Sequence, residues 1–169
     1  MIDSFTGEYR WLSNFHLVDV VYAGVTYPST EHAYQAAKTE DPAERKPLSD
    51  RTLPPGKAKK IGQQVTMSQN WDKIKLSVME ELLRQKFHNE DLRIKLLATG
   101  TQELVEGNSW GDRYWGVSGG RGQNNLGKIL MKIRSELQAP PENWPPLGDC
   151  IHGISLEYPC LKCDPDDRD

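Results

Sequence analysis

Cysteine is absent from most of this sequence, because all three cysteines lie within the last twenty of its 169 residues. A disulfide framework in the body of the chain is therefore excluded, and packing alone must stabilise the core. The chain also lacks an apolar run of about 20 residues, the length needed to cross a bilayer. Its start, MIDSFTGEYRW, lacks the basic residues, apolar stretch and cleavage site of a secretory signal. We therefore expect a cytoplasmic protein without membrane contact.

An excess of charge of one sign is also lacking, since 21 basic and 24 acidic residues leave a net charge of −3. No global field would attract nucleic acid or an anionic membrane, so any polyanion must be held locally. The hydrophobic fraction is a modest 37%, but five Trp, six Tyr and three Phe supply large side chains for a core. The length is that of one ordinary domain.

The residue pattern near the N-terminus predicts a short β-hairpin followed by a helix. Val18, Val20 and Tyr22 stand in alternation along the chain, and a turn at residues 23–24 follows. Ser29 or Thr30 then has the hydroxyl of a good N-cap for a helix over residues 31–38. One face of that helix is polar where a core face should be apolar.

Three later segments show helical periodicity. Asp72 is the predicted cap of a helix with Ile74, Val78 and Leu82 facing inward, and Asp91 the predicted cap of the next. The third helix carries Leu126, Leu130, Ile133 and Leu137. Residues 41–56, rich in Pro and charge, are predicted to form a loop, and residues 104–106 a short strand. The expected fold class is mainly α (α+β).

A glycine-rich loop, GVSGGRGQNNLG at residues 116–127, precedes the last helix. Glycines allow close backbone approach, and a helix start offers free amides to a phosphate. We therefore expect Gly116, Gly119 and Gly120 to bind phosphate, with Arg121 adding charge. The domain is expected to span residues 1–139, and a Pro-rich extension to follow over residues 140–169.

Several motifs resemble the NADAR (YbiA-like) family in their order and spacing. They are L-S-N-F, Y-P-S-T-E-H-A-Y-Q-A-A-K, N-W-D with a following M-x-x-L-L-R-x-K-F, T-G-x-x-x-L-V-E, D-R-Y-W-G and N-N-L-G-K-I-L-M-K-I-R, over about residues 5–137. The resemblance implies a single-domain helical bundle of YbiA-like type with a short N-terminal β-hairpin. It also implies hydrolysis of an N-glycosidic bond, in an early riboflavin-pathway intermediate or in ADP-ribosylated guanine.

Cleavage of such a bond develops positive charge on the sugar, which a nearby carboxylate stabilises, and a second group must move a proton. By the resemblance, Glu31 faces the anomeric carbon and Asp112 is its partner. The alternatives are a helix-dipole role for Glu31 and a turn-forming role for Asp112. Lys38 could hold a phosphate, tune Glu31 or attack an opened sugar as an amine, or it is a solvated lysine.

The remaining candidates are expected to bind the substrate. Trp71 and Trp115, together with Trp11 and Tyr114, could stack on a base, although at least two of these four should belong to the core. Hydrogen bonds to sugar hydroxyls or phosphate are expected from Ser13, Asn14, Asn124 and Asn125. His32 and Gln35 should orient Glu31, or His32 is a core histidine bonded to backbone.

The C-terminal tail holds Cys150, His152, Cys160 and Cys163, which could form a tetrahedral structural zinc site. The close spacing of the first pair weakens this pattern, and reduced cysteines in a loose tail are the alternative. No cofactor is expected for catalysis.

We therefore predict an N-glycosidase acting on a phosphoribosyl or ADP-ribosyl group, either in a nucleotide-like small molecule or on guanine in nucleic acid. The alternative is a non-catalytic ADP-ribose or NAD-binding module. A structural or host-interaction protein that reuses the fold is disfavoured by the polar helix face and the glycine-rich loop. The motifs distinguish neither the leaving group nor the oligomeric state.

Overall fold

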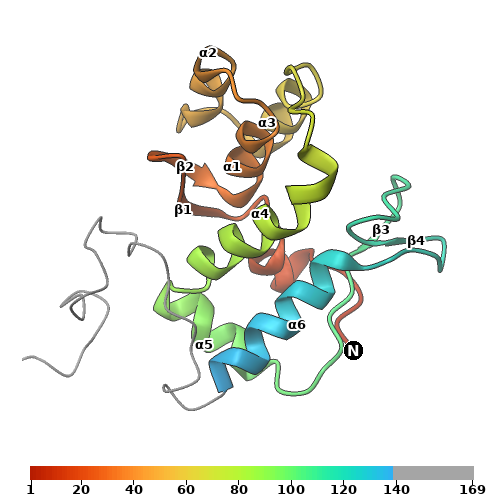
Figure 1. The fold of residues 1–169 in the computed structure, drawn as a ribbon. Coiled ribbons are helices and arrows are strands. Elements are labelled where there is room, and N and C mark those ends of the chain that lie inside the picture. Colours follow the sequence, from red (N-terminus) through yellow and green to blue (C-terminus); the bar gives the residue numbers. More distant parts are fainter. Residues whose placement is uncertain (139–169) are drawn as a thin grey trace, which may run out of the picture.

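The computed structural model describes residues 1–138, and its ribbon places helix α1 (Thr30–Ala37) beside the hairpin, with α3 next to it and α4 below (Figure 1). The element order is η1 (Gly7–Leu12), β1 (Leu17–Tyr22), β2 (Val25–Ser29), α1, α2 (Pro42–Arg45), η2 (Lys46–Ser49), α3 (Pro55–Ile61), α4 (Trp71–Lys86), α5 (Glu90–Ala98), β3 (Gly107–Asn108), β4 (Val117–Ser118) and α6 (Asn125–Gln138). The expected mainly α fold with an N-terminal hairpin is confirmed. The tail with the suggested zinc ligands lies outside the described residues.

The predicted hairpin is present. β1 and β2 pair antiparallel, and the two residues between them, Ala23 (φ 49°) and Gly24 (φ 75°), have the positive φ of a tight turn that suits the strand twist. Val20 and Tyr27 are partners in the register and are both buried. One face of the hairpin thus packs against the core, and its second strand leads directly into α1.

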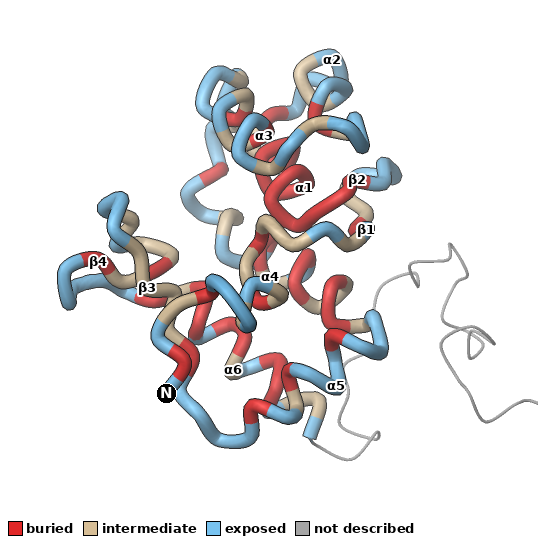
Figure 2. Tube along the Cα trace, turned by 180° about the vertical axis from the view of Figure 1, so that it is seen from behind, coloured by how far each residue is buried: buried red, intermediate tan, exposed pale blue. Residues whose placement is uncertain are grey.

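Helix α1 begins where its sequence predicts. The Ser29 hydroxyl accepts a hydrogen bond from the His32 amide at 3.3 Å and also contacts His32 Nδ1 at 2.6 Å. All eight residues of α1 are buried, because the helix contacts α3, α4, both hairpin strands and η2 (Figure 2). A helix that carries Glu31 and Gln35 is therefore almost entirely removed from the protein surface.

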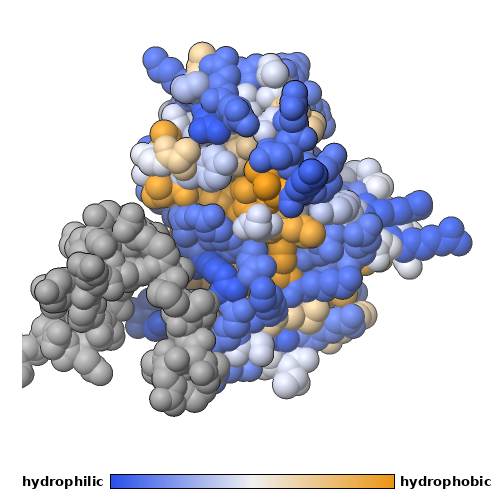
Figure 3. All heavy atoms as spheres, in the orientation of Figure 1, coloured by the Kyte–Doolittle hydropathy of each residue, from blue (hydrophilic) through white to orange (hydrophobic). Residues whose placement is uncertain are grey.

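The lower part of the fold is a helical core of α4, α5 and α6. Leu82, Leu96, Leu130 and Ile133 are fully buried there, which confirms the periodicity expected for these segments. Figure 3 shows one face of the molecule as mostly hydrophilic, with hydrophobic residues gathered near its middle. Within residues 1–138 no helix is both long and apolar enough to cross a membrane.

Two predicted caps each lie two residues from the observed one. Helix α4 starts at Trp71 after Asn70, so Asp72 lies in its first turn, where its negative charge interacts favourably with the helix dipole. In α5 the cap is Asn89, whose side chain accepts a hydrogen bond from Leu92 N at 3.2 Å, rather than Asp91. Both errors arose because an acidic residue in a first turn and an acidic cap look alike in sequence.

Two loop assignments also differ from the prediction. Residues 41–56 include α2 and η2 and run into α3, because Asp41 caps Ala43 N at 2.8 Å and Pro42 is the first helical residue. The strand predicted at residues 104–106 is reduced to one isolated bridge between Ile2 and Leu104. The two-residue strand β3 begins just after it and pairs parallel with β4.

Replacing Ser29 by alanine should lower the free energy of unfolding by about 1–2 kcal/mol, because α1 loses its side-chain cap and His32 loses a buried partner. Urea unfolding followed by circular dichroism measures the change. The control is Ser135→Ala on the exposed side of α6, which should shift stability by less than about 0.5 kcal/mol. Equal stabilities of the two variants would show that the cap does not stabilise the fold.

Candidate active site

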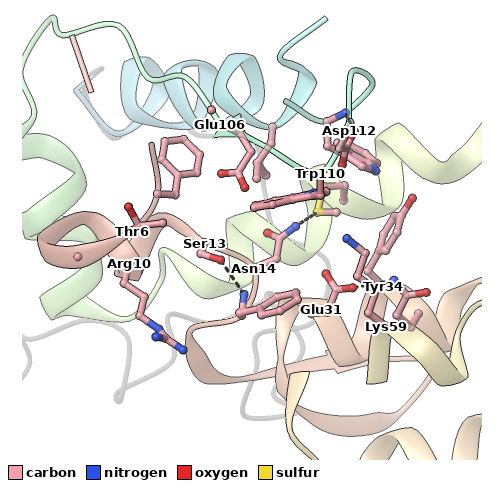
Figure 4. Close-up of a pocket in the computed structure, with 18 of the residues that line it drawn as sticks. Thr6, Arg10, Ser13, Asn14, Glu31, Tyr34, Lys59, Glu106, Trp110 and Asp112 are labelled. Carbon is pink, nitrogen blue, oxygen red and sulfur yellow. Dashed lines mark hydrogen bonds between the residues drawn. The ribbon is translucent and has the colours of Figure 1, made fainter. Parts of the chain in front are cut away.

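A cavity of about 540 Å³ opens beside α1. Figure 4 shows Glu31 and Lys59 on one side of it, Glu106 and Asp112 on the opposite side, and the Trp110 ring between them. The lining residues are Phe5, Thr6, Gly7, Arg10, Ser13, Asn14, Phe15, Glu31, Tyr34, Gln35, Lys38, Lys59, Met79, Glu106, Gly107, Trp110, Asp112, Trp115 and Leu126. This volume suits a nucleotide-sized ligand, since small-molecule sites are typically about 300–1,000 Å³.

Glu31 lies in the cavity wall but is only 6% exposed. Its amide donates to Asn14 O at 3.1 Å, and its Oε1 accepts a hydrogen bond from Gln35 Nε2 at 2.7 Å. Burial raises the pKa of the carboxyl, while the Gln35 hydrogen bond and the charges of Lys59 and Lys38 oppose that rise. Oε2 makes no hydrogen bond within residues 1–138, so it can interact with a ligand.

Gln35 is itself held in place by a glycine that the sequence patterns did not single out. A Cβ on Gly62 would come within 2.0 Å of Gln35 Oε1, so only glycine leaves room for this side chain. Lys38 Nζ donates to Gly62 O at 3.3 Å. Burial is the main cause that lowers the pKa of Lys38, and Glu31 opposes it. The polar face of α1 therefore consists of a fixed Glu31–Gln35 pair with a lysine one turn further on.

Asp112 both forms a turn and faces the cavity. Its Oδ1 accepts hydrogen bonds from Tyr114 N at 3.0 Å and Trp115 N at 2.9 Å. The Asn108 side chain accepts from Asp112 N at 3.0 Å and donates to Asp112 O at 2.8 Å. The turn-forming role considered from the sequence is thus present. The remaining oxygen, Oδ2, has no hydrogen-bond partner in the described part of the chain.

A third carboxylate, Glu106, lines the cavity and was not among the predicted site residues. Burial and the charge of Asp112 raise its pKa to about 7. The only sequence signal for it was its place at the end of the T-G-x-x-x-L-V-E motif. Within residues 1–138, no group of three or more His, Cys, Asp or Glu side chains is arranged to hold a metal ion.

Positively charged side chains from separate elements line the cavity. Besides Lys38, Arg10 on η1 and Lys59 on α3 line it, and neither had been singled out from the sequence. Lys59 Nζ lies 5.9 Å from the centre of the Trp110 ring. Three cations at one nucleotide-sized cavity provide local binding for an anion in a chain with no net positive charge.

Of the four aromatic residues expected to stack on a base, the structure brings only Trp115 to the cavity. Trp71 is buried against Tyr34, with ring centres 5.0 Å apart, and Trp11 packs edge-on to Phe87 at 6.3 Å. The exposed aromatic at this site is instead Trp110, which is 62% exposed. An isolated Trp in a loop has no periodicity that would have identified it.

The polar candidates divide into two groups. Ser13 and Asn14 line the cavity, and Asn14 Oδ1 is buried without a hydrogen-bond partner in the described residues. His32 lies elsewhere, because its Nδ1 contacts Ser29 Oγ and its Nε2 contacts Leu53 O at 2.8 Å. It is the backbone-bonded core histidine of the alternative interpretation.

Of the glycine-rich loop at residues 116–127, Leu126 lines the cavity but the glycines do not. Gly116, Gly119, Gly120, Asn124 and Asn125 are all missing from the lining. Gly119 and Gly120 are exposed and have positive φ values of 59° and 74°, so they shape a turn. Their backbone conformation forms the turn between β4 and α6, outside this cavity, and their binding of a phosphate stays a prediction.

The sequence and the fold are similar to those of known proteins. A family model described as the NADAR domain matches residues 4–138. N-glycosidase YbiA of Escherichia coli (strain K12) is 37% identical over 138 residues, which cover 79% of this chain and 85% of that protein. The riboflavin biosynthesis protein VVA0006 of Vibrio vulnificus (strain YJ016) is 38% identical over 141 residues, covering 78% of this chain and 36% of that protein. The NMR structure of the E. coli protein YbiA has a TM-score of 0.69 at 35% identity, covering 81% of this chain and 86% of that one.

Beneath the cavity, Lys86 is fully buried at the end of α4. Its Nζ donates to Ser13 O at 2.8 Å, which ties the cavity segment after η1 to the helical core. Burial lowers the pKa of Lys86 to about 7, against the opposing charge of Glu106. The ordinary pKa of 10.5 applies to the unfolded chain, so between pH 7 and 10.5 the unfolded chain binds more protons than the folded chain.

Lys86 should therefore make the protein more stable as the pH rises through this window, and Lys86→Met should remove that rise. Urea unfolding at pH values of about 7, 8.5 and 10 measures the free energy of unfolding, and the difference between parent and variant should grow with pH. The loss of the Ser13 hydrogen bond adds a contribution that does not vary with pH. Lys128→Met, at an exposed position of α6, controls for the removal of one lysine. A gap that stays constant across the range would contradict the assignment.

Proposed function

Because this chain belongs to the NADAR domain family, we propose that it hydrolyses the N-glycosidic bond of a phosphoribosyl or ADP-ribosyl substrate. Its relatives named N-glycosidases support the reaction class, a hydrolase acting on N-glycosyl bonds. The identity of the substrate is our proposal. The observation that carries it is the buried carboxylate of Glu31 in the wall of a nucleotide-sized cavity that also holds cations and aromatic rings.

Glu31 is suited to stabilise a sugar cation. When the bond to nitrogen breaks, positive charge develops on the ribose ring and its anomeric carbon, and a fixed carboxylate in a shielded site stabilises that charge strongly. Burial raises the Glu31 pKa, so the ground state disfavours its negative charge. A developing cation beside Oε2 supplies the missing counter-charge, so the stabilisation is largest in the transition state.

The other groups suit the remaining parts of such a substrate. Arg10 and Lys59 are placed to bind phosphate oxygens, and Asn14 Oδ1 offers an unused acceptor to a sugar hydroxyl. The Trp110 and Trp115 rings provide faces for a planar base. Asp112 has a free oxygen with which to accept the proton of an attacking water.

Incubation of the protein with ADP-ribosylated guanine in DNA, with NAD and with a riboflavin-pathway intermediate tests the proposal. Mass spectrometry would detect the released base together with the free sugar. Hydrolysis of any of the three supports the function and identifies the leaving group. Tight binding of all three without release of base would favour the alternative, a non-catalytic binding module.

Glu31→Gln should lower turnover by about 10²–10³, equivalent to about 3–4 kcal/mol, while substrate affinity stays within a few-fold of the parent. Glutamine keeps the shape but loses the charge that interacts with the transition state. Single-turnover rates and calorimetric affinities separate the two effects. The matched control, Glu81→Gln on the exposed side of α4, should leave both unchanged. Loss of affinity with an unchanged rate at saturation would make Glu31 a substrate ligand instead.

A further inference from the structure

The three carboxylates of the cavity differ in the hydrogen bonds they accept. Asp112 Oδ1 accepts two backbone amides, and Glu31 Oε1 accepts one side-chain amide. The Glu106 carboxylate accepts no hydrogen bond from residues 1–138, and its Oε2 is buried. Donated hydrogen bonds favour the ionised form of a carboxyl group. Glu106 therefore has the surroundings in which a protonated carboxyl is most stable.

The backbone of Glu106 is held rigidly. Its amide donates to Asn124 Oδ1 at 3.0 Å, and its carbonyl accepts from Val117 N at 2.9 Å. A Cβ on Gly116 would come 2.1 Å from Glu106 O and 2.9 Å from Glu106 Cγ, so glycine is required there. Asn124 also donates to Leu104 O at 2.9 Å. Two residues predicted to touch substrate thus fix the position of Glu106.

The charges around Glu106 act in both directions. Asp112 and Glu31 favour its protonated form, whereas Lys59 and Lys86 favour its ionised form. Burial is the largest effect and favours the protonated form, so the pKa of about 7 lies where proton donation is efficient at neutral pH.

We propose that Glu106 is a catalytic residue of this site, the general acid that protonates the departing nitrogen. This inference rests on the proposed function and assigns to Glu106 a step that the sequence motifs left to Asp112. Three geometric observations support this role. Glu106 faces the cavity opposite Glu31, and its backbone is fixed by the hydrogen bond to Asn124. Its carboxylate accepts no hydrogen bond from residues 1–138.

The step is balanced as follows. The bond between the anomeric carbon and nitrogen breaks, its electron pair goes to nitrogen, and the Glu106 proton is transferred to that nitrogen. Water adds its oxygen to the anomeric carbon, and Asp112 accepts the proton that the water loses. Release of this proton to solvent and uptake of one by Glu106 restore both groups. The net reaction is addition of one water across the bond.

Two probes that share ADP-ribose distinguish this role. Guanine leaving ADP-ribosylated DNA must gain a proton, whereas the nicotinamide of NAD leaves as a neutral base and needs none. Glu106→Gln should lower the single-turnover rate on the guanine substrate by about 10²–10⁴. Its rate on NAD should stay within about tenfold of the parent. The control, Glu103→Gln, removes an exposed carboxylate three residues away.

The pH dependence gives an independent readout. Since the acid must be protonated, the parent rate on the guanine substrate should fall above about pH 7, and this fall should be absent in Glu106→Gln. Equal losses on both probes, or a fall that persists in the variant, would overturn the assignment. A thermal melt confirms that the variant is folded.

If the parent cleaves neither probe, the ADP-ribosyl part of the proposed function fails, and the state of Glu106 is still measurable. Titration of the ¹³C-labelled carboxyl by NMR, with Glu106→Gln to identify its signal, should show a midpoint near 7. A midpoint at or below the ordinary value of 4.5 would overturn the inference by itself.

Discussion

The burial of a polar helix is the constraint on which this structure depends. Every residue of α1 is shielded, yet Glu31, His32 and Gln35 carry groups that need hydrogen bonds. An isolated buried charge costs several kcal/mol, so partners must be brought from other elements. Asn14 O receives the Glu31 amide, and Leu53 O meets the His32 ring. The segments before and after α1 are thereby fixed around the carboxylate that the proposed chemistry uses.

A second constraint operates across the cavity, where the chain has little regular structure. The wall there consists of two-residue strands and turns, and side-chain hydrogen bonds replace a sheet ladder. The Asn108 side chain hydrogen-bonds both the amide and the carbonyl of Asp112. The Asn124 side chain hydrogen-bonds Leu104 O and Glu106 N. An asparagine side chain has both a donor and an acceptor, so one residue can hydrogen-bond two backbone groups of such an irregular segment.

Local signals in the sequence were sufficient for the scaffold. The turn at residues 23–24, the Ser29 cap and the periodicity of α4 and α6 act within a few residues, and the structure follows them. The site required more, because Lys59, Trp110 and Glu106 meet only through tertiary folding. For the glycine-rich loop, a glycine for a turn and a glycine for a phosphate have the same sequence signature, so its binding of phosphate stays a prediction.

The division of labour among the three carboxylates follows from how each is held. Asp112 Oδ1 accepts hydrogen bonds from two backbone amides, and the buried Glu31 accepts one from a side-chain amide and lies near two lysines that oppose the rise of its pKa. The backbone of Glu106 is fixed by a hydrogen bond, but its carboxylate accepts none from residues 1–138. The reaction we propose asks one carboxylate to stabilise a cation, one to accept a proton and one to donate a proton, and the three environments differ in the way that these roles require. Donated hydrogen bonds favour the ionised form of a carboxyl group, so separate donor sets within one cavity give residues of a single chemical type different chemistry.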